Sequence, residues 1–205
     1  MSVRGLYAIY DRTTLADDAL EAVAAVLAGG ACWLQYRDKR ATGPDAALLG
    51  ELRALTRAYD ARLIVNDDWR LAQAVAADGV HLGQSDGSLA RARAALGEQA
   101  IIGISCSGSV ERARAGIAEG ASYVSFGRFF DSATKPDAPL ADPAVLAQAR
   151  TLGVPVVAIG GIDRDNAADI IAAGADLIAV SGALFHAADS GAAARALAAL
   201  FQRAG

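Results

Sequence analysis

Ala173-Gly174-Ala175-Asp176-Leu177-Ile178-Ala179-Val180 joins an alanine-rich helical run to an apolar run of strand type through a glycine. The same arrangement recurs at residues 28–31, 77–80 and 119–122, with Gly79 in the closing position of the second copy. Glycine suits the left-handed conformation that ends many helices, so each copy predicts a helix that stops at the glycine and feeds a strand. Helices and strands therefore alternate along the chain.

The predicted strands are short and apolar on consecutive positions, and most are rich in β-branched or aromatic residues. Continuous apolarity is typical of strands buried on both faces, as in a parallel sheet covered by helices. Helical periodicity appears between them, for example at residues 15–27, 46–58 and 110–118, and Pro44 and Pro143 stand where first helical turns are expected. The predicted strands are residues 6–10, 32–36, 63–65, 80–82, 101–105, 123–126, 156–159 and 177–180.

Eight strand–helix units in 205 residues leave little room for a second domain. A closed eight-stranded barrel fits near the lower end of the size range of that fold, about 200 to 400 residues. An open doubly wound sheet is the rival architecture, but the first predicted strand is not followed by a Gly-x-Gly-x-x-Gly turn. The α/β pattern therefore predicts a single (β/α)8 TIM barrel over residues 1–205.

Composition excludes several classes of protein. The net charge of −4, from 19 Lys and Arg against 23 Asp and Glu, gives no electrostatic footprint for nucleic acid or an anionic membrane. The two cysteines, Cys32 and Cys106, are too few for a disulfide framework. The first residues lack a signal-peptide core, and no apolar stretch approaches the roughly 18 residues of a membrane span. These features favour a cytoplasmic protein without nucleic-acid or membrane partners, and they leave open whether it forms a homo-oligomer.

In a TIM barrel the chemistry lies at the carboxyl ends of the strands, so the polar residues that follow each apolar run are the candidate site. After the second run, Gln35, Arg37 and Lys39 alternate with Tyr36 and Asp38, so in an extended chain the first three project to one side. Two cations and an amide suit a polyanion, and arginine can bind phosphate oxygens in bidentate fashion. The alternative is a solvated strand end.

Carboxylates follow the third and fourth runs, at Asn66-Asp67-Asp68 and at Asp86. Asp67 and Asp86 facing the cations suggest a divalent ion, because Mg²⁺ is typically held by one or two carboxylates together with substrate phosphate oxygens and water. The alternative is ordinary ion pairing of these carboxylates with Arg37 and Lys39, which does not exclude the first interpretation. Asp68 is expected to cap the third helix.

Glycines follow the last two runs, at Gly160-Gly161 and Ser181-Gly182, where backbone amides can approach a ligand closely. Many barrels bind a phosphate there, although the structural alternative is that glycine only makes a tight turn. Residues 127–139, which include Thr134 and Lys135, form the longest stretch without a helix or strand pattern. We expect this stretch to act as an active-site lid between two phosphate-binding regions.

The ordered set of these motifs resembles the thiamine phosphate synthase family over essentially the whole chain. The motifs are Gln35-x-Arg37-x-Lys39, Val65-Asn66-Asp67-Asp68, His81-x-Gly83-Gln84-x-Asp86, Gly103-Ile104-Ser105-Cys106, Gly127-Arg128-Phe129-Phe130 with Thr134-Lys135-Pro136, and Ile159-Gly160-Gly161-Ile162. The resemblance implies a (β/α)8 barrel that joins hydroxymethylpyrimidine diphosphate to thiazole phosphate and releases diphosphate and thiamine phosphate. It implies Mg²⁺ as the cofactor and a dissociative substitution that needs no nucleophilic side chain.

Site residues follow from the resemblance position by position. The pyrimidine diphosphate would contact Gln35, Arg37, Lys39, Asn66, Ser105 and Lys135, of which Arg37, Lys39, Ser105 and Lys135 are the expected catalytic residues. Asp67 and Asp86 resemble the Mg²⁺ carboxylates of the family. The thiazole phosphate would be held by Ser132, Ala133, Thr134, Gly161, Ser181 and Gly182.

This sequence departs from the family at two places. Many members carry a histidine shortly after the serine that corresponds to Ser105, and an aliphatic residue followed by serine where this chain has Ser181-Gly182. The alternatives are a related thiazole tautomerase, which needs a general acid–base that the missing histidine argues against, and a non-catalytic barrel that binds thiamine phosphate. His81 is expected to have a structural or supporting role, and His186 to lie on the surface.

Overall fold

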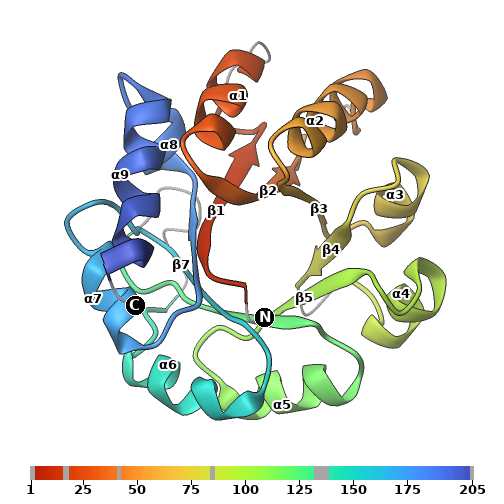
Figure 1. Ribbon diagram of the computed structural model, residues 1–205. Helices are drawn as coiled ribbons and strands as arrows, with labels where there is room; N and C mark the ends of the chain where they lie inside the picture. The colour runs from red at the N-terminus through yellow and green to blue at the C-terminus, as the bar shows by residue number, and fades with distance from the viewer. Residues whose placement is uncertain (1–2, 16–18, 41–42, 84–85, 132–138, 204–205) are drawn as a thin grey trace.

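The computed structural model describes residues 3–15, 19–40, 43–83, 86–131 and 139–203. Eight parallel strands pair in chain order and close into a barrel, because β1 pairs with β8 as well as with β2. Helices surround the barrel on the outside (Figure 1). The predicted (β/α)8 TIM barrel is confirmed.

All eight predicted strands are present. Four have the predicted bounds, and the first four in the chain are longer by one residue at one or both ends. The strands are β1 (Gly5–Asp11), β2 (Ala31–Arg37), β3 (Arg62–Asn66), β4 (Gly79–Leu82), β5 (Ile101–Ser105), β6 (Tyr123–Phe126), β7 (Val156–Ile159) and β8 (Leu177–Val180).

The helices α2 and α5 have the predicted bounds, whereas α1 begins five residues later than expected. The backbone carbonyl of Asp11 accepts from the N–H groups of Thr14 and Leu15, so the chain turns before the helix begins. The helical elements are α1 (Leu20–Ala28), α2 (Ala46–Ala58), α3 (Trp69–Ala74), α4 (Leu89–Leu96), α5 (Val110–Ala118), α6 (Ala144–Ala149), the 3₁₀ turn η1 (Arg150–Leu152), α7 (Ala167–Ala173), α8 (Gly182–Phe185) and α9 (Ser190–Arg203).

The repeated helix–glycine–strand arrangement predicted that Gly79 ends a helix, but it does not. It is the first residue of β4, and Ala76 instead takes the positive φ, at 50°. A Cβ at Gly79 would lie 1.8 Å from the carbonyl oxygen of Ile101, so this position needs glycine for close strand packing. At Gly120 and Gly174 the prediction is confirmed: each glycine follows a helix with a positive φ, 103° and 123°.

The strands alternate between two apolar layers. Leu6, Ala8 and Tyr10 of β1 pack outward against the helices, whereas Tyr7 and Ile9 belong to a separate cluster inside the barrel. That interior cluster also contains Trp33, Ile64, Tyr123, Val157, Leu177 and Ala179. The barrel is therefore filled by side chains over its lower part, and polar residues follow the interior positions toward the carboxyl ends of the strands.

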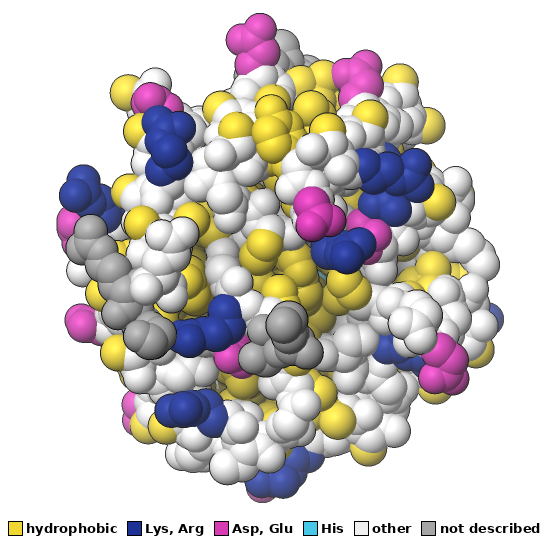
Figure 2. Space-filling model, viewed as in Figure 1, with side chains coloured by type: hydrophobic (Ala, Val, Ile, Leu, Met, Phe, Trp, Pro, Cys, Tyr) yellow, Lys and Arg dark blue, Asp and Glu magenta, His cyan; other side chains and the backbone are white. Residues whose placement is uncertain are grey.

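The molecular surface carries charges of both signs. In the face that Figure 2 displays, Lys and Arg side chains lie beside Asp and Glu side chains and are not gathered into one patch. Within the described ranges, no helix is long and apolar enough to cross a membrane.

Candidate functional site

A cavity of about 450 Å³ lies at the carboxyl ends of the strands, where the barrel fold places binding sites. Residues of β1, β2, β3, β4, β5, β6, β7 and β8, and of the loops that follow them, contribute to its wall. Among the predicted site residues, the lining includes Gln35, Arg37, Asn66, Ser105, Gly161, Ser181 and Gly182.

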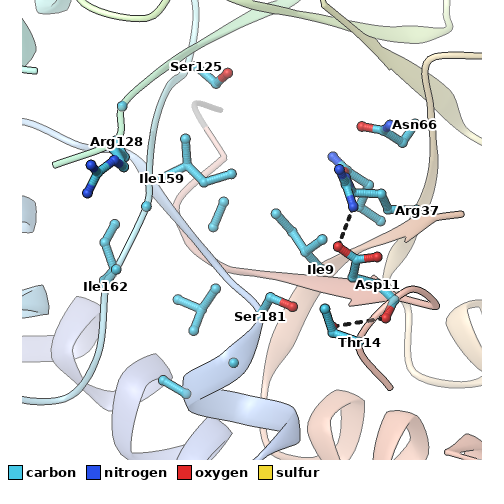
Figure 3. Close-up of a pocket in the computed structure, with 18 of the residues that line it drawn as sticks. Ile9, Asp11, Thr14, Arg37, Asn66, Ser125, Arg128, Ile159, Ile162 and Ser181 are labelled. Atoms are coloured by element: carbon cyan, nitrogen blue, oxygen red, sulfur yellow. Dashed lines mark hydrogen bonds and ion pairs between the residues drawn. The ribbon is translucent and has the colours of Figure 1, made fainter. Parts of the chain in front are cut away.

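Arg37 forms an ion pair with Asp11 on one side of the cavity (Figure 3). The two residues are partners in the register of β1 and β2, so both side chains project inward at the same level. Asp11 is fully buried, and its Oδ1 atom also accepts from the backbone N–H and the hydroxyl of Thr13, at 3.0 and 2.6 Å. The carboxylate thus fixes the guanidinium and the turn after β1 together. Sequence reasoning missed Asp11, although it directly follows an apolar run.

The predicted alternation of Gln35, Arg37 and Lys39 holds only within the strand. Gln35 and Arg37 line the cavity, but β2 ends at Arg37 and Lys39 is not among the lining residues. Lys39 is half-exposed and its ammonium group pairs with Asp67. A strand alternates in direction only where its backbone is extended, so the pattern cannot be carried past the last strand residue.

Asp67 and Asp86 lie together, as the sequence predicted. The carboxyl groups of the two residues are within hydrogen-bonding reach of each other, and Oδ2 of Asp86 accepts from the N–H of Gly83 at 2.7 Å. Burial and the neighbouring Asp86 raise the pKa of Asp67, and the Lys39 ammonium group offsets only part of this. The alternative of ion pairing is found in part: Lys39 pairs with Asp67. Arg37 instead pairs with Asp11.

This carboxylate pair fits a hard divalent cation. Within the described ranges, no cluster of three or more His, Cys, Asp and Glu side chains suited to a metal is found. Mg²⁺ commonly takes one or two carboxylates and completes its shell with phosphate oxygens and water. Burial and the repulsion between the two adjacent carboxylates raise the pKa of Asp67, and a bound divalent cation would remove this repulsion.

A wall rich in glycine follows β7 and β8, and β8 lies beside β1 in the closed barrel. Gly160 and Gly161 follow β7 with φ of 102° and 67°, and Ser181 and Gly182 follow β8. A Cβ at Gly161 would lie 2.4 Å from the carbonyl oxygen of Asp131, so only glycine fits here. These residues leave the backbone open to a ligand, as a phosphate site requires.

Two further side chains line the cavity that the sequence did not assign to it. Arg128 lies across the cavity from Arg37 (Figure 3) and binds Oδ1 of Asp131 at 2.6 Å. His186 is exposed as predicted, but it borders the cavity, because the short helix α8 turns it back toward the barrel. His81 has the supporting position expected for it, with its Nε2 atom 3.0 Å from the hydroxyl of Ser105.

Ser132, Ala133, Thr134 and Lys135 lie outside the described residues, as does most of the predicted lid at 127–139. The lid therefore stays a prediction. The described part of that stretch, residues 127–131, passes beside Gly160 and Gly161: the N–H of Phe130 donates to the carbonyl of Gly160 at 3.0 Å.

Neither cysteine has the environment of a nucleophile. Burial raises the pKa of Cys106 to about 12 and that of Cys32 to about 11. Asp68 caps α3 as predicted, because its Oδ1 atom accepts from the N–H groups of Arg70 and Leu71 at 2.9 and 3.1 Å.

Comparisons with known proteins agree with this geometry. A family model described as thiamine monophosphate synthase matches residues 6–184. The thiamine-phosphate synthase of Methylobacillus flagellatus is 54% identical over 200 residues, which are 97% of this chain and 96% of that protein. That of Chromobacterium violaceum is 53% identical over 201 residues, which are 97% of each chain.

Solved structures give the same result. The thiamine phosphate pyrophosphorylase of Pyrococcus furiosus superposes with a TM-score of 0.86 at 35% identity, covering 97% of this chain and 96% of that one. A 3-hexulose-6-phosphate synthase, with a TM-score of 0.70 and 22% identity, covers 96% of this chain and 99% of that one and shares the fold.

Proposed function

The chain belongs to the thiamine monophosphate synthase family, and from that premise we propose that its cavity joins a pyrimidine diphosphate to a thiazole phosphate. It is a transferase that makes thiamine phosphate. We place the two substrates in different regions of the cavity because its two ends differ in chemistry. Cations and carboxylates meet at β1, β2 and β3, and the glycine-rich wall lies at β7 and β8.

The first end suits a departing diphosphate. The bond between the pyrimidine methylene carbon and the diphosphate oxygen breaks, and its electron pair leaves with the diphosphate. Arg37, Lys39 and Lys135 are the cations that would neutralise the growing negative charge, which is the largest single contribution that a site of this kind makes. Lys39 and Lys135 are the only lysines in the sequence. Lysine is a compact and mobile point charge, so it can follow a leaving group more readily than the planar arginine fork.

The second end suits the nucleophile. The lone pair of the thiazole nitrogen forms the new bond to the methylene carbon, and this nitrogen carries no proton that a base must remove. The thiazole phosphate would lie against Gly161, Ser181 and Gly182, with Ser132, Ala133 and Thr134 completing the contact. No side-chain nucleophile is needed, in agreement with the raised pKa of Cys106.

Asp67 and Asp86 would hold the Mg²⁺ ion of this reaction. When bound, the ion supplies Lewis-acid neutralisation of the diphosphate. Lys39 would then exchange its contact with Asp67 for one with the diphosphate, because the metal takes over the neutralisation of that carboxylate. Gln35, Asn66 and Ser105 would orient the pyrimidine.

Incubation of the purified protein with both phosphorylated substrates and Mg²⁺ tests the proposal, with thiamine phosphate followed by chromatography. We expect product and an equal amount of diphosphate. Isomerisation of the thiazole without product would instead indicate a tautomerase. Tight calorimetric binding of thiamine phosphate without turnover would indicate a binding protein.

Two variants test the diphosphate end. Lys135→Ala and Asp67→Ala should each lower kcat by about 100-fold or more while the fold is kept, as loss of one charge-stabilising group commonly does. Asp165→Asn, an exposed carboxylate outside the cavity, is the matched control. Near-normal rates in Lys135→Ala or Asp67→Ala would mean that the leaving group is handled by other residues.

A further inference from the structure

A hydrogen-bonded series of side chains crosses the barrel beneath the cavity, and we call it the interior network. It runs from Gln35 on β2 through Tyr7 on β1, Tyr123 on β6 and His81 on β4 to Ser105 on β5. The successive distances are 2.7 Å (Gln35 Nε2 to Tyr7 Oη), 3.1 Å (Tyr7 Oη to Tyr123 Oη), 2.8 Å (Tyr123 Oη to His81 Nδ1) and 3.0 Å (His81 Nε2 to Ser105 Oγ). Gln35, His81 and Ser105 line the cavity, and the two tyrosines between Gln35 and His81 are fully buried.

The Gln35 end gives the network a direction. The amide nitrogen of Gln35 can only donate, so the oxygen of Tyr7 accepts. Among the contacts within the described residues, the Tyr123 oxygen is the remaining acceptor for the Tyr7 proton, so we take Tyr7 as the donor of this bond. Tyr123 has then accepted one bond, and its own proton goes to Nδ1 of His81. A ring nitrogen that accepts carries a lone pair, so a neutral His81 has its proton on Nε2.

The contacts at the opposite end of the network are compatible with this tautomer. The hydroxyl of Ser125 donates to the carbonyl of Ile104 at 3.4 Å, and the same oxygen lies 3.4 Å from Nε2 of His81. A Ser125 hydroxyl that donates to Ile104 accepts from His81, which is compatible with a proton on Nε2. The assignment of the tautomer therefore rests on the direction of the bonds that begin at Gln35.

The two phenols remain donors at any working pH. Burial raises the pKa of Tyr7 and of Tyr123 well above the ordinary value of 10.0. The space for this arrangement comes from Gly103, where a Cβ would lie 2.0 Å from the Tyr123 ring. Tyr123 also packs edge-on to Trp33, with ring centroids 5.0 Å apart, so its hydroxyl has little freedom to move.

We propose that Tyr7 and Tyr123 are positioning residues, which hold His81 as the Nε2–H tautomer and so fix Ser105 as a hydrogen-bond donor and the Gln35 carboxamide oxygen as an acceptor in the cavity. The one proton on Nε2 of His81 goes mainly to the nearer oxygen, that of Ser105 at 3.0 Å rather than that of Ser125 at 3.4 Å, and this leaves the Ser105 proton for a ligand. Gln35 uses its amide nitrogen on Tyr7, which leaves its oxygen for a ligand.

This inference rests on the proposed function for its ligand, because Gln35 and Ser105 are proposed pyrimidine contacts. An aminopyrimidine presents an amino donor beside a ring-nitrogen acceptor. The Gln35 oxygen can accept from the amino group, and the Ser105 hydroxyl can donate to the ring nitrogen. If the donor and acceptor roles of Gln35 and Ser105 were exchanged, they would not match the aminopyrimidine. The network would thus discriminate an aminopyrimidine from a pyrimidone, in which the donor and acceptor positions are exchanged.

Nitrogen NMR of the native protein without substrate tests the tautomer directly. Imidazole-¹⁵N labelling and long-range proton–nitrogen correlation at pH about 8, where an ordinary imidazole is neutral, distinguish the two tautomers. Only His81 and His186 contribute signals, and His186→Gln assigns them. We expect protonated Nε2 and unprotonated Nδ1 in His81. Protonated Nδ1, or an even mixture, would overturn the proposal, whether or not the protein makes thiamine phosphate.

Variants separate the members of the network. Tyr123→Phe removes the donor to Nδ1, so the His81 signals should show mixed tautomers. Tyr7→Phe keeps the Tyr123 hydroxyl but frees its oxygen to accept from His81, so the tautomer with a protonated Nδ1 should appear to a smaller extent than in Tyr123→Phe. Tyr10→Phe is the matched control, because Tyr10 lies on the same strand but packs outward against Phe185. A native pattern in Tyr123→Phe would contradict the assigned role of Tyr123.

Kinetics test the role in substrate binding. Tyr123→Phe should lower kcat/KM for the pyrimidine diphosphate roughly tenfold, the size of one hydrogen bond, with little change in KM for the thiazole phosphate. If Tyr123 acts through Ser105, the same substitution should have less than about a twofold effect in a Ser105→Ala background. Equal losses in both backgrounds, or equal losses for both substrates, would show a general structural effect instead.

Discussion

Lys39 and Asp67 form an ion pair at the edge of the cavity, although neither side chain lies on a strand. Lys39 follows β2 by two residues, and Asp67 directly follows β3 with a positive φ of 67°. The cation proposed for the leaving group and the carboxylate proposed for the metal therefore neutralise each other in the unliganded protein. Binding of a metal diphosphate would separate them without leaving either charge uncompensated.

The carboxylate pair predicts how stability depends on pH. Because the pKa of Asp67 is raised above its ordinary value of 3.8, the folded state holds the proton more tightly than the unfolded state does. This stabilisation is complete below pH 3.8 and is lost as the pH rises through the folded value. Asp67→Asn has no carboxyl group to titrate and does not undergo this loss. Its unfolding free energy should therefore rise relative to that of the native protein as the pH increases from 3.8 to neutrality. Denaturant unfolding in a chelating buffer measures the difference.

The metal adds a second measurement to the same variant. Mg²⁺ should raise the Tm of the native protein and have little effect on Asp67→Asn, since a ligand stabilises only the state that binds it. Asp68→Asn is the control: it keeps the cap of α3, so we expect a change below about 0.5 kcal/mol and a native response to Mg²⁺. An unaltered Mg²⁺ response in Asp67→Asn would remove that carboxylate from the metal site.

Asp11 predicts a different kind of loss, because it is buried and holds a charge. Asp11→Ala should cost about 3–5 kcal/mol, as removal of one partner of a buried ion pair commonly does. Asp11→Asn keeps an oxygen for Thr13 but loses the charge that orients Arg37, so its main effect should be on the pyrimidine diphosphate, with KM raised about tenfold. Unfolding curves and steady-state kinetics separate the two losses. If Asp11→Asn bound that substrate normally, Arg37 would not depend on Asp11 for its position.

The barrel could be predicted from the sequence because its pattern is local. A strand covered on both faces is a continuous apolar run, and each of the eight runs was a strand. The expectation for α1 was wrong because Asp11 binds the following turn, a choice between local hydrogen bonds that apolar periodicity does not report. Gly79 was misassigned for a related reason. The sequence does not distinguish a glycine that close packing requires from one that a turn requires.

The sequence indicated several of the residues that line the cavity, but not which side chains form ion pairs with one another. Seven of the predicted site residues line the cavity, and the roles assigned to them stay predictions. Arg37 was expected beside Asp67 and Asp86, but the register of β1 with β2 sets it against Asp11. Register is decided by tertiary packing, so no pattern within one segment reveals it. The interior network joins five strands and is hidden from sequence for the same reason.

The thiols are predicted to be unreactive in the native protein. Burial raises the pKa of Cys106 to about 12, so this thiol is almost entirely protonated at pH 8. Iodoacetamide at pH 8 should therefore leave Cys106 unmodified and turnover unchanged, and alkylation should begin only in strongly alkaline solution. The same protein in guanidinium should react at both cysteines, as mass spectrometry would show. Rapid loss of activity with label on Cys106 would contradict this assignment.

The glycine-rich wall allows backbone strain to be separated from the loss of ligand contact. Gly161 and Gly153 both have a positive φ, 67° and 76°, but a Cβ at Gly153 meets nothing within 4 Å whereas one at Gly161 meets the carbonyl of Asp131. Gly153→Ala should therefore cost only the strain of a left-handed residue, about 1–2 kcal/mol, with native kinetics.

Gly161→Ala should cost more than Gly153→Ala in unfolding free energy, because the new methyl group also displaces Asp131 and the segment before it. It should raise KM for the thiazole phosphate while KM for the pyrimidine diphosphate stays near its native value, since the diphosphate end lies across the cavity. Denaturant unfolding and steady-state kinetics with each substrate varied in turn measure the two effects. Equal stability losses in the two variants would contradict the clash with Asp131. A change in KM confined to the pyrimidine diphosphate would place the thiazole phosphate away from this wall.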